Sequence, residues 1–168
     1  GNTNWIFQQP GAKVWIGSNG TDWGVASNWS PAGVPAASDR VVFGSMAVGG
    51  CALDQNRSVS GVDIQSGFAG KALDLGEFTM TSTGDFTVAN VQDVLDAQAA
   101  GCVVELSGTG DLSNPNWYNM FGTLKVAAEG ETTTLTGAVR STRLEIGAGT
   151  VAIGSNGLYA GDAAQTGM

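Results

Sequence analysis

The sequence predicts an all-β protein built as a parallel β-helix, or β-solenoid, and three observations predict it. Residues 117–158 hold very short segments in which apolar and polar residues alternate, as in 123–126 (TLKV) and 143–146 (RLEI). Glycines separate these segments, as turns between strands require. Charged residues make up only 13 % of the chain, about half the usual share, which favours a hydroxyl-rich β surface. Strands this short bury their apolar face only when coils stack on one another.

Composition and charge exclude several classes of partner. Apolar residues are 42 % of the 168 residues, so the 26 glycines do not mark a disordered linker. Fifteen acidic residues against seven basic ones leave a net charge of −8, which disfavours nucleic acid and anionic membranes as partners. No apolar run approaches the ~18 residues that a membrane-spanning helix needs. We therefore expect neither nucleic acid nor a membrane as partner.

Residues 1–12 are predicted to form a lead-in strand or arm. The apolar run Trp5-Ile6-Phe7 is the candidate contact with a scaffold protein or a sister subunit. The same residues have neither the basic nor the apolar region of a signal peptide, so we expect no export by the general secretory route.

Residues 13–45 are predicted to form a compact, tryptophan-rich cap at the N-terminal end of the solenoid. Trp15, Trp23 and Trp29 lie close together, and Pro31 and Pro35 follow them. The favoured interpretation is that the indoles plug the open apolar end of the stack. The alternative is an exposed platform on which sugars stack.

The order of residues from Trp15 to Phe43 resembles the start of passenger-type parallel β-helix proteins. These are large surface proteins of bacteria, and related modules occur in phage virion proteins. Residues 62–88 and 104–126 are similar to the same group. The resemblance implies a right-handed parallel β-helix and a location on a virion or cell surface.

Residues 46–160 are predicted to form the body of the solenoid. Apolar pairs recur every six to eleven residues between 58 and 88, such as Val62/Ile64 and Phe86/Val88. With two or three strands to a turn, one coil takes about 20–30 residues. About four coils are expected from residue 58 onward, followed by a tail at 161–168. The last coil is expected to be open unless a second copy, a neighbouring protein or Tyr159 covers it.

One short helix is predicted to interrupt the coils at about residues 90–100. Val91, Val94 and Leu95 have helical spacing, Asn90 is a suitable N-cap, and Gly101 suits the C′ position. This segment departs from the Gly-rich turn that the resemblance implies there.

Few residues are candidates for catalysis. The chain has no histidine, which removes His-based triads and His metal sites. Asp63, Asp74 and Asp85 follow one another at intervals of eleven residues and could align on one face, with Lys71 nearby. Aligned carboxylates can cleave glycosidic bonds or bind Ca²⁺. Solvated turn residues are the favoured interpretation, so we expect no cofactor, no metal and no enzymatic activity.

Cys51 and Cys102 allow two readings. They are either a disulfide of an oxidising compartment or two buried free thiols, and the second is favoured.

These expectations combine into a non-enzymatic structural surface protein of an assembled particle, most simply a decoration or spike component of a phage virion. Its partners would be a capsid or other scaffold protein and sister subunits. The alternative is a secreted bacterial adhesin or carbohydrate-binding passenger module that binds cell-surface glycan through Trp15, Trp23 and Trp29. A polysaccharide lyase or hydrolase using Asp63, Asp74 and Asp85 is the third, least favoured possibility.

Overall fold

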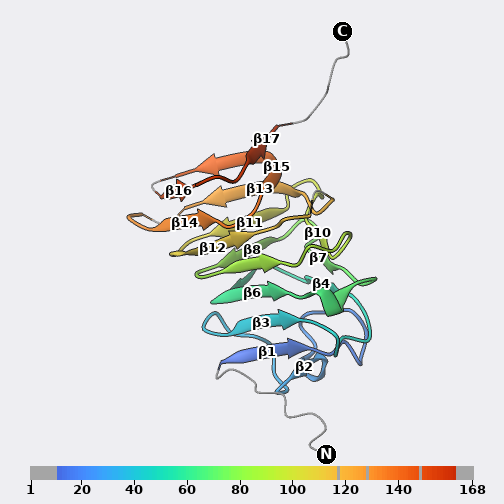
Figure 1. Cartoon of the computed structure of the whole chain (residues 1–168). Helices are drawn as coiled ribbons and strands as arrows, with labels where there is room; N and C mark the ends of the chain where they lie inside the picture. The colour runs from blue at the N-terminus through green and yellow to red at the C-terminus, as the bar shows by residue number, and fades with distance from the viewer. Residues whose placement is uncertain (1–10, 117, 128, 148, 162–168) are drawn as a thin grey trace, which may run out of the picture.

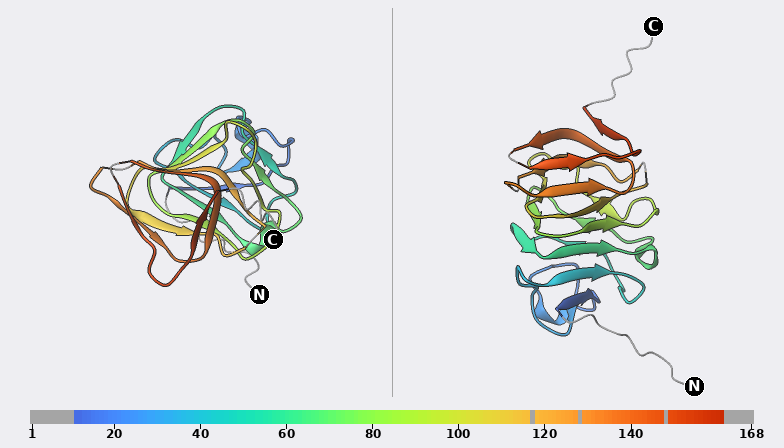
Figure 2. Two further views of the ribbon diagram at one scale, coloured as in Figure 1. Left: turned by 90° about the horizontal axis from the view of Figure 1, so that it is seen from above. Right: turned by 60° about the vertical axis from the view of Figure 1, so that its left-hand side comes forward.

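The computed structural model describes residues 11–116, 118–127, 129–147 and 149–161, which form a β-solenoid of about five turns. The strands lie one above another from β1 at one end to β17 at the other (Figure 1). Seen along the stack, successive coils overlie one another, and the later coils extend to one side (Figure 2). The prediction of an all-β protein made of stacked coils is therefore confirmed.

The strands belong to three sheets. The eight-stranded sheet contains, in spatial order, β16 (Thr150–Ala152), β14 (Thr132–Leu135), β12 (Gly110–Ser113), β9 (Phe86–Val88), β6 (Gly61–Ile64), β3 (Arg40–Phe43), β1 (Ala12–Trp15) and β2 (Trp29–Ser30). The six-stranded sheet contains β17 (Leu158–Ala160), β15 (Val139–Ile146), β13 (Phe121–Val126), β11 (Val103–Leu106), β8 (Thr79–Ser82) and β5 (Arg57–Val59). The three-stranded sheet contains β10 (Leu95–Asp96), β7 (Leu73–Asp74) and β4 (Cys51–Ala52), and two short 3-10 turns are η1 (Ala26–Asn28) and η2 (Ser66–Phe68).

Strands of successive coils pair in parallel register. Val41, Val62 and Phe86 are register partners in β3, β6 and β9, and all three side chains are buried. Stacked partners lie 20 residues apart at Glu105 and Lys125, and 26 apart at Asp85 and Asp111. The expected coil length of about 20–30 residues is thus confirmed. The one antiparallel pair of strands in the described part of the chain is β1 with β2.

The core consists of columns of apolar side chains, one from each coil. Each column runs along the inner face of a sheet, and its members are at most 3 % exposed. The columns are Val41, Val62, Phe86, Leu112 and Leu135 in the eight-stranded sheet, Met80, Val104 and Leu124 in the six-stranded sheet, and Cys51, Leu73 and Leu95 in the three-stranded sheet. Burying each large apolar side chain contributes roughly 1.5–3 kcal/mol, so the stack is stabilised coil by coil.

The turn that leads into β9 needs glycine for steric reasons. A Cβ atom placed on Gly84 would lie 2.5 Å from the carbonyl oxygen of Ser60 in the preceding coil. Because the obstacle is backbone, it cannot move aside without disturbing the stacking. The close spacing of the two coils at this corner therefore requires a residue without a Cβ atom.

The prediction of a helix at about residues 90–100 was wrong. This segment is a turn followed by β10, and Asp93 has φ of +58°, which an α-helix does not allow. Leu95 and Asp96 pair with Leu73 and Asp74, and the N–H of Leu73 donates to the carbonyl of Val94 at 3.0 Å. The backbone of this segment therefore makes its hydrogen bonds to the neighbouring coil and not within a helix. The described residues contain no helix long and apolar enough to cross a membrane.

Candidate functional site

The three tryptophans of residues 13–45 pack against one another at the β1 end of the stack. The ring centroids of Trp15 and Trp29 are 5.0 Å apart, those of Trp23 and Trp29 are 4.6 Å apart, and both pairs meet edge to face. Phe43 lies beneath all three indoles. All three indole side chains are fully buried, so no indole face is available here for stacking on a sugar.

A buried asparagine organises the loop that carries these rings. The Oδ1 atom of Asn28 accepts a hydrogen bond from the N–H of Asn19 at 2.7 Å, and its Nδ2 donates to the carbonyls of Gly20 and Asp22. The indole N–H of Trp29 donates to the carbonyl of Trp23 at 2.9 Å. These bonds hold β2 antiparallel against β1, so the outer edge of β1 is covered.

The strands of this segment also belong to the solenoid itself. β1 and β3 pair in parallel with each other, and β3 pairs with β6. Parallel pairing between coils thus includes strands that lie before residue 46, the predicted start of the solenoid body. Trp5, Ile6 and Phe7, the candidate partner contact, lie outside the described residues.

Asp63, Asp74 and Asp85 do not converge. Asp63 lies on β6 in the eight-stranded sheet, Asp74 lies on β7 in the three-stranded sheet, and Asp85 lies in the turn before β9. Asp63 contacts the Arg40 guanidinium at 3.5 Å and accepts a hydrogen bond from Thr87 at 3.2 Å.

The carboxylates of Asp74 and Asp85 accept hydrogen bonds from backbone N–H groups. Asp74 accepts from the N–H of Gly76 at 2.8 Å, and Asp85 accepts from the N–H of Asp111 at 3.0 Å. Among the described residues, no group of three or more His, Cys, Asp or Glu side chains can hold a metal ion. The three carboxylates therefore make three separate contacts and are not aligned on one face, which was the less favoured alternative.

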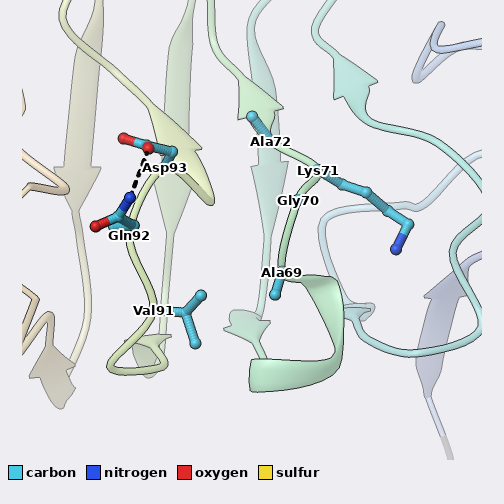
Figure 3. A pocket seen from close by; sticks show the side chains of 7 residues that line it. All are labelled: Ala69, Gly70, Lys71, Ala72, Val91, Gln92 and Asp93. Atoms are coloured by element: carbon cyan, nitrogen blue, oxygen red, sulfur yellow. Dashed lines mark hydrogen bonds between the residues drawn. The ribbon is translucent and has the colours of Figure 1, made fainter.

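A shallow groove of about 460 Å³ lies between the loops of two neighbouring coils, at residues 69–72 and 91–93 (Figure 3). Ala69 and Val91 face each other across it, and Lys71 extends away from the pair formed by Gln92 and Asp93. That pair is joined by a long hydrogen bond of 3.4 Å. Because its charged groups diverge, the groove offers no set of polar atoms that could orient a substrate.

Both cysteines are buried free thiols, as the favoured interpretation expected. Burial, reinforced by the carboxylates of Asp96 and Asp74, raises the pKa of Cys102 to about 11. Burial also raises the pKa of Cys51, and the carboxylates of Asp22 and Asp54 add to the effect. Thiols held protonated in this way are poor nucleophiles and poor metal ligands.

The β17 end of the stack differs from the β1 end because it exposes apolar side chains. Ile146 is 51 % exposed, Ile153 is 39 % exposed and Tyr159 is 52 % exposed. Val151 and Leu158 pack against the core but remain partly accessible. Tyr159 therefore does not seal this end. Exposed apolar residues are thus gathered at this end of the described stack.

Of these two surfaces, the open last coil was expected from the sequence and the groove was not. The groove was missed because residues 91–93 were assigned to a helix, although the repeated pair Leu-Asp at 73–74 and 95–96 signals stacked strands. The apolar end had a clearer signal, because residues 146–161 contain no Asp, Glu, Lys or Arg.

No protein-family model, curated protein or solved structure matches the chain. The resemblance to passenger-type proteins thus has support from the solenoid fold alone.

Proposed function

We propose that this protein is a non-enzymatic structural component on the surface of an assembled particle, most simply a decoration or spike protein of a phage virion. The observation that carries the proposal is the architecture itself. The described residues form a continuous core of stacked apolar columns, and the groove at residues 69–72 and 91–93 is shallow with diverging charges. Such a body supplies length and rigidity rather than a reaction chamber.

The charge distribution supports a role on a crowded surface. The net charge of −8 is spread over an exterior rich in Thr, Ser and Asn, which keeps an assembly soluble and repels nucleic acid. Lys125 and Glu105 form an ion pair at 3.3 Å across neighbouring coils. Arg40 and Asp63 are paired across coils in the same way, at 3.5 Å.

Three finer features belong to this proposal. The solenoid is right-handed and is of the passenger-type class that the Trp15–Phe43 motif resembles. The packed indoles act as its N-terminal cap, an interpretation supported by the burial of Trp15, Trp23 and Trp29 and by β2 covering β1. Residues 5–7 attach the protein to its scaffold.

Two measurements test attachment to a particle. An antibody against the purified protein should label particles isolated from the source by density gradient and imaged by electron microscopy. Added full-length protein should rebind stripped particles, whereas a variant lacking residues 1–10 should not, with its far-UV circular dichroism and melting temperature unchanged. Absence of labelling contradicts the particle role, and rebinding by the truncated variant contradicts the role of residues 5–7.

The adhesin alternative predicts sugar binding through the indoles. Because these rings are buried, we expect no signal on a glycan array and no quenching of tryptophan fluorescence by polysaccharide. Saturable quenching that shifts the emission would favour the adhesin instead. For the hydrolase alternative, a reducing-sugar assay should detect no more product with the wild-type protein than with the control variant Asp74→Asn.

A further inference from the structure

The pentapeptide Ile-Gly-Ser-Asn-Gly occurs twice in the chain, at residues 16–20 and 153–157. In both copies it directly follows a strand of the eight-stranded sheet, β1 or β16. We propose that Asn19 is a site of spontaneous deamidation in the folded protein, whereas Asn156, in the same local sequence, is protected by the fold. This modification is independent of particle attachment.

Deamidation of an Asn-Gly pair needs only the chain and one molecule of water. The backbone nitrogen of Gly20 loses its proton and attacks Cγ of Asn19, and the new N–Cγ bond closes a five-membered succinimide ring. The Cγ–Nδ2 bond breaks, and Nδ2 takes up a proton and leaves as ammonia. Water then opens the ring at the side-chain carbonyl, giving aspartate, or at the main-chain carbonyl, giving isoaspartate. The attack is fast for an uncatalysed reaction because both groups belong to neighbouring residues.

Access to the attacking nitrogen differs between the two copies. Asn19 and Gly20 are both exposed, and the Gly20 N–H donates no hydrogen bond within the described residues. A Cβ atom placed on Gly20 would have no atom within 4 Å, so the surroundings of this residue are open. Asn156 and Gly157 are half-buried, and a Cβ atom on Gly157 would lie 2.4 Å from the ring of Tyr159. Water and base therefore reach the nitrogen of Gly20 more easily.

The surroundings of the leaving amide nitrogen also differ. Nδ2 of Asn19 lies 3.0 Å from Oγ of Ser27 and 3.2 Å from Oγ of Ser18. These hydroxyls accept from the amide before the reaction, and a hydroxyl proton can pass to the nitrogen as the Cγ–Nδ2 bond breaks. Nδ2 of Asn156 instead donates to the carbonyl oxygen of Leu135 at 2.6 Å, and a carbonyl oxygen has no proton to give.

Ring closure also demands that the side chain turn toward the next backbone nitrogen. The part-buried bond to Leu135 ties the side chain of Asn156 to the preceding coil, and this bond breaks when the side chain turns. The partners of the Asn19 amide are two exposed serine side chains, which water can replace at little cost. Closing the ring therefore costs more free energy at residue 156 than at residue 19.

The two products at residue 19 should differ in stability. Asn28 accepts a hydrogen bond from the N–H of Asn19 and donates one to the carbonyl of Gly20, so it bridges the reacting pair. Aspartate leaves the course of the backbone unchanged. Isoaspartate inserts one further backbone atom between the two bonded groups, so both bonds of Asn28 cannot keep their lengths. The isoaspartate form should therefore melt at a lower temperature.

Peptide mapping by mass spectrometry tests this inference on the full chain. The native protein is incubated at mildly alkaline pH, and digests taken over time are analysed for conversion of the amide to a carboxylate in each pentapeptide. We expect residue 19 to react about tenfold faster than residue 156, or more. In urea the two rates should become equal, because the two pentapeptides are identical.

Three variants separate the contributions. Asn19→Gln should reduce the release of ammonia from the native protein to that of residue 156, because glutamine does not close a five-membered ring. Ser27→Ala should slow the reaction at residue 19 several-fold, with residue 156 of the same molecule as the unchanged control. Asn19→Asp should melt close to wild type, whereas aged protein that an isoaspartate-specific methyltransferase labels should melt lower.

Equal rates at the two residues in the native protein overturn the proposal, as does a faster reaction at residue 156. A native protein that stays unmodified at residue 19, while the protein in urea is modified there, overturns it too. If the two rates still differ in urea, the selectivity does not come from the fold and the proposal is wrong. An unchanged rate in Ser27→Ala overturns the role given to its hydroxyl.

Discussion

The side chain of Asn119 donates a hydrogen bond to the carbonyl of Val91 at 2.7 Å, across 28 residues of sequence. Its Oδ1 atom accepts the N–H of Val94 at 3.3 Å, and the side chain is buried. One asparagine therefore binds the backbone on both sides of the turn at 92–93 and ties two coils together. In a helix at 90–100, the Val94 N–H and the Val91 carbonyl would instead form hydrogen bonds with other residues of the same helix.

Replacing Asn119 with alanine should destabilise the protein by about 2–4 kcal/mol, because two buried backbone groups lose their partner. Urea unfolding followed by circular dichroism measures the change. Asn90→Ala is the control, since Asn90 is exposed and its side chain accepts a long bond from Asn116 at 3.3 Å. Equal losses in the two variants would contradict the role given to Asn119.

Asp93→Gly should stabilise the protein by about 0.5–1 kcal/mol, because φ of +58° strains any residue with a Cβ. Asp93→Ala removes the same charge but keeps the Cβ, so it should not stabilise. Thermal melts of both variants separate the backbone effect from the charge effect. If both variants gain stability equally, the charge and not the backbone is responsible.

Gly84→Ala should cost about 2–4 kcal/mol, because its new methyl group meets the Ser60 carbonyl oxygen at 2.5 Å. Gly49→Ala serves as the control, since the nearest atom there is the Gly17 carbonyl oxygen at an ordinary 3.9 Å. Denaturation midpoints should fall for the first variant and stay close to wild type for the second. A tolerated alanine at residue 84 would show that the coils can separate at this corner.

The indoles of Trp23 and Trp29 should respond differently to substitution by phenylalanine. Trp29→Phe removes a buried hydrogen bond to the Trp23 carbonyl, whereas the indole N–H of Trp23 has no partner in the described residues. Trp29→Phe should therefore be less stable than Trp23→Phe by about 1–2 kcal/mol. Chemical unfolding of the two variants under identical conditions measures the difference, and a reversed order would contradict the assigned bond.

The buried thiols should make stability fall at alkaline pH. An unfolded cysteine ionises near its ordinary pKa of 9.0, whereas native Cys102 keeps its proton until about 11. Between these values the unfolded state binds fewer protons, so the free energy of unfolding decreases by up to about 1.4 kcal/mol per pH unit for this thiol. Below pH 9 the contribution is constant.

Urea unfolding at a series of pH values tests this dependence. The variant Cys102→Ala should show a shallower decline between pH 9 and 11, because only its other groups titrate. An unchanged slope in the variant would show that Cys102 does not contribute. A thiol reagent should modify neither cysteine in the native protein at pH 8 and both in urea.

The placement of Asp63, Asp74 and Asp85 shows why spacing in sequence did not give their positions. Asp74 is stacked on Asp96, 22 residues away, so a step of eleven residues moves about halfway round the coil instead of one coil up. The alternation of apolar and polar residues within a strand can be recognised in the sequence. Which residues of successive coils lie above one another depends on the length of each coil, and the sequence pattern does not give that length.

The sequence by itself determined that short apolar-alternating strands stack as parallel coils of about 20–30 residues, because period-2 patterning and glycine turns act over a few residues. Only the tertiary structure decided that residues 91–96 form a turn and a strand, since Asn119 and Leu73 bind their backbone from other coils. It also decided that the indoles are buried rather than exposed. The sequence allows either burial or exposure of these rings, and their packing against Phe43 is visible only in the tertiary structure.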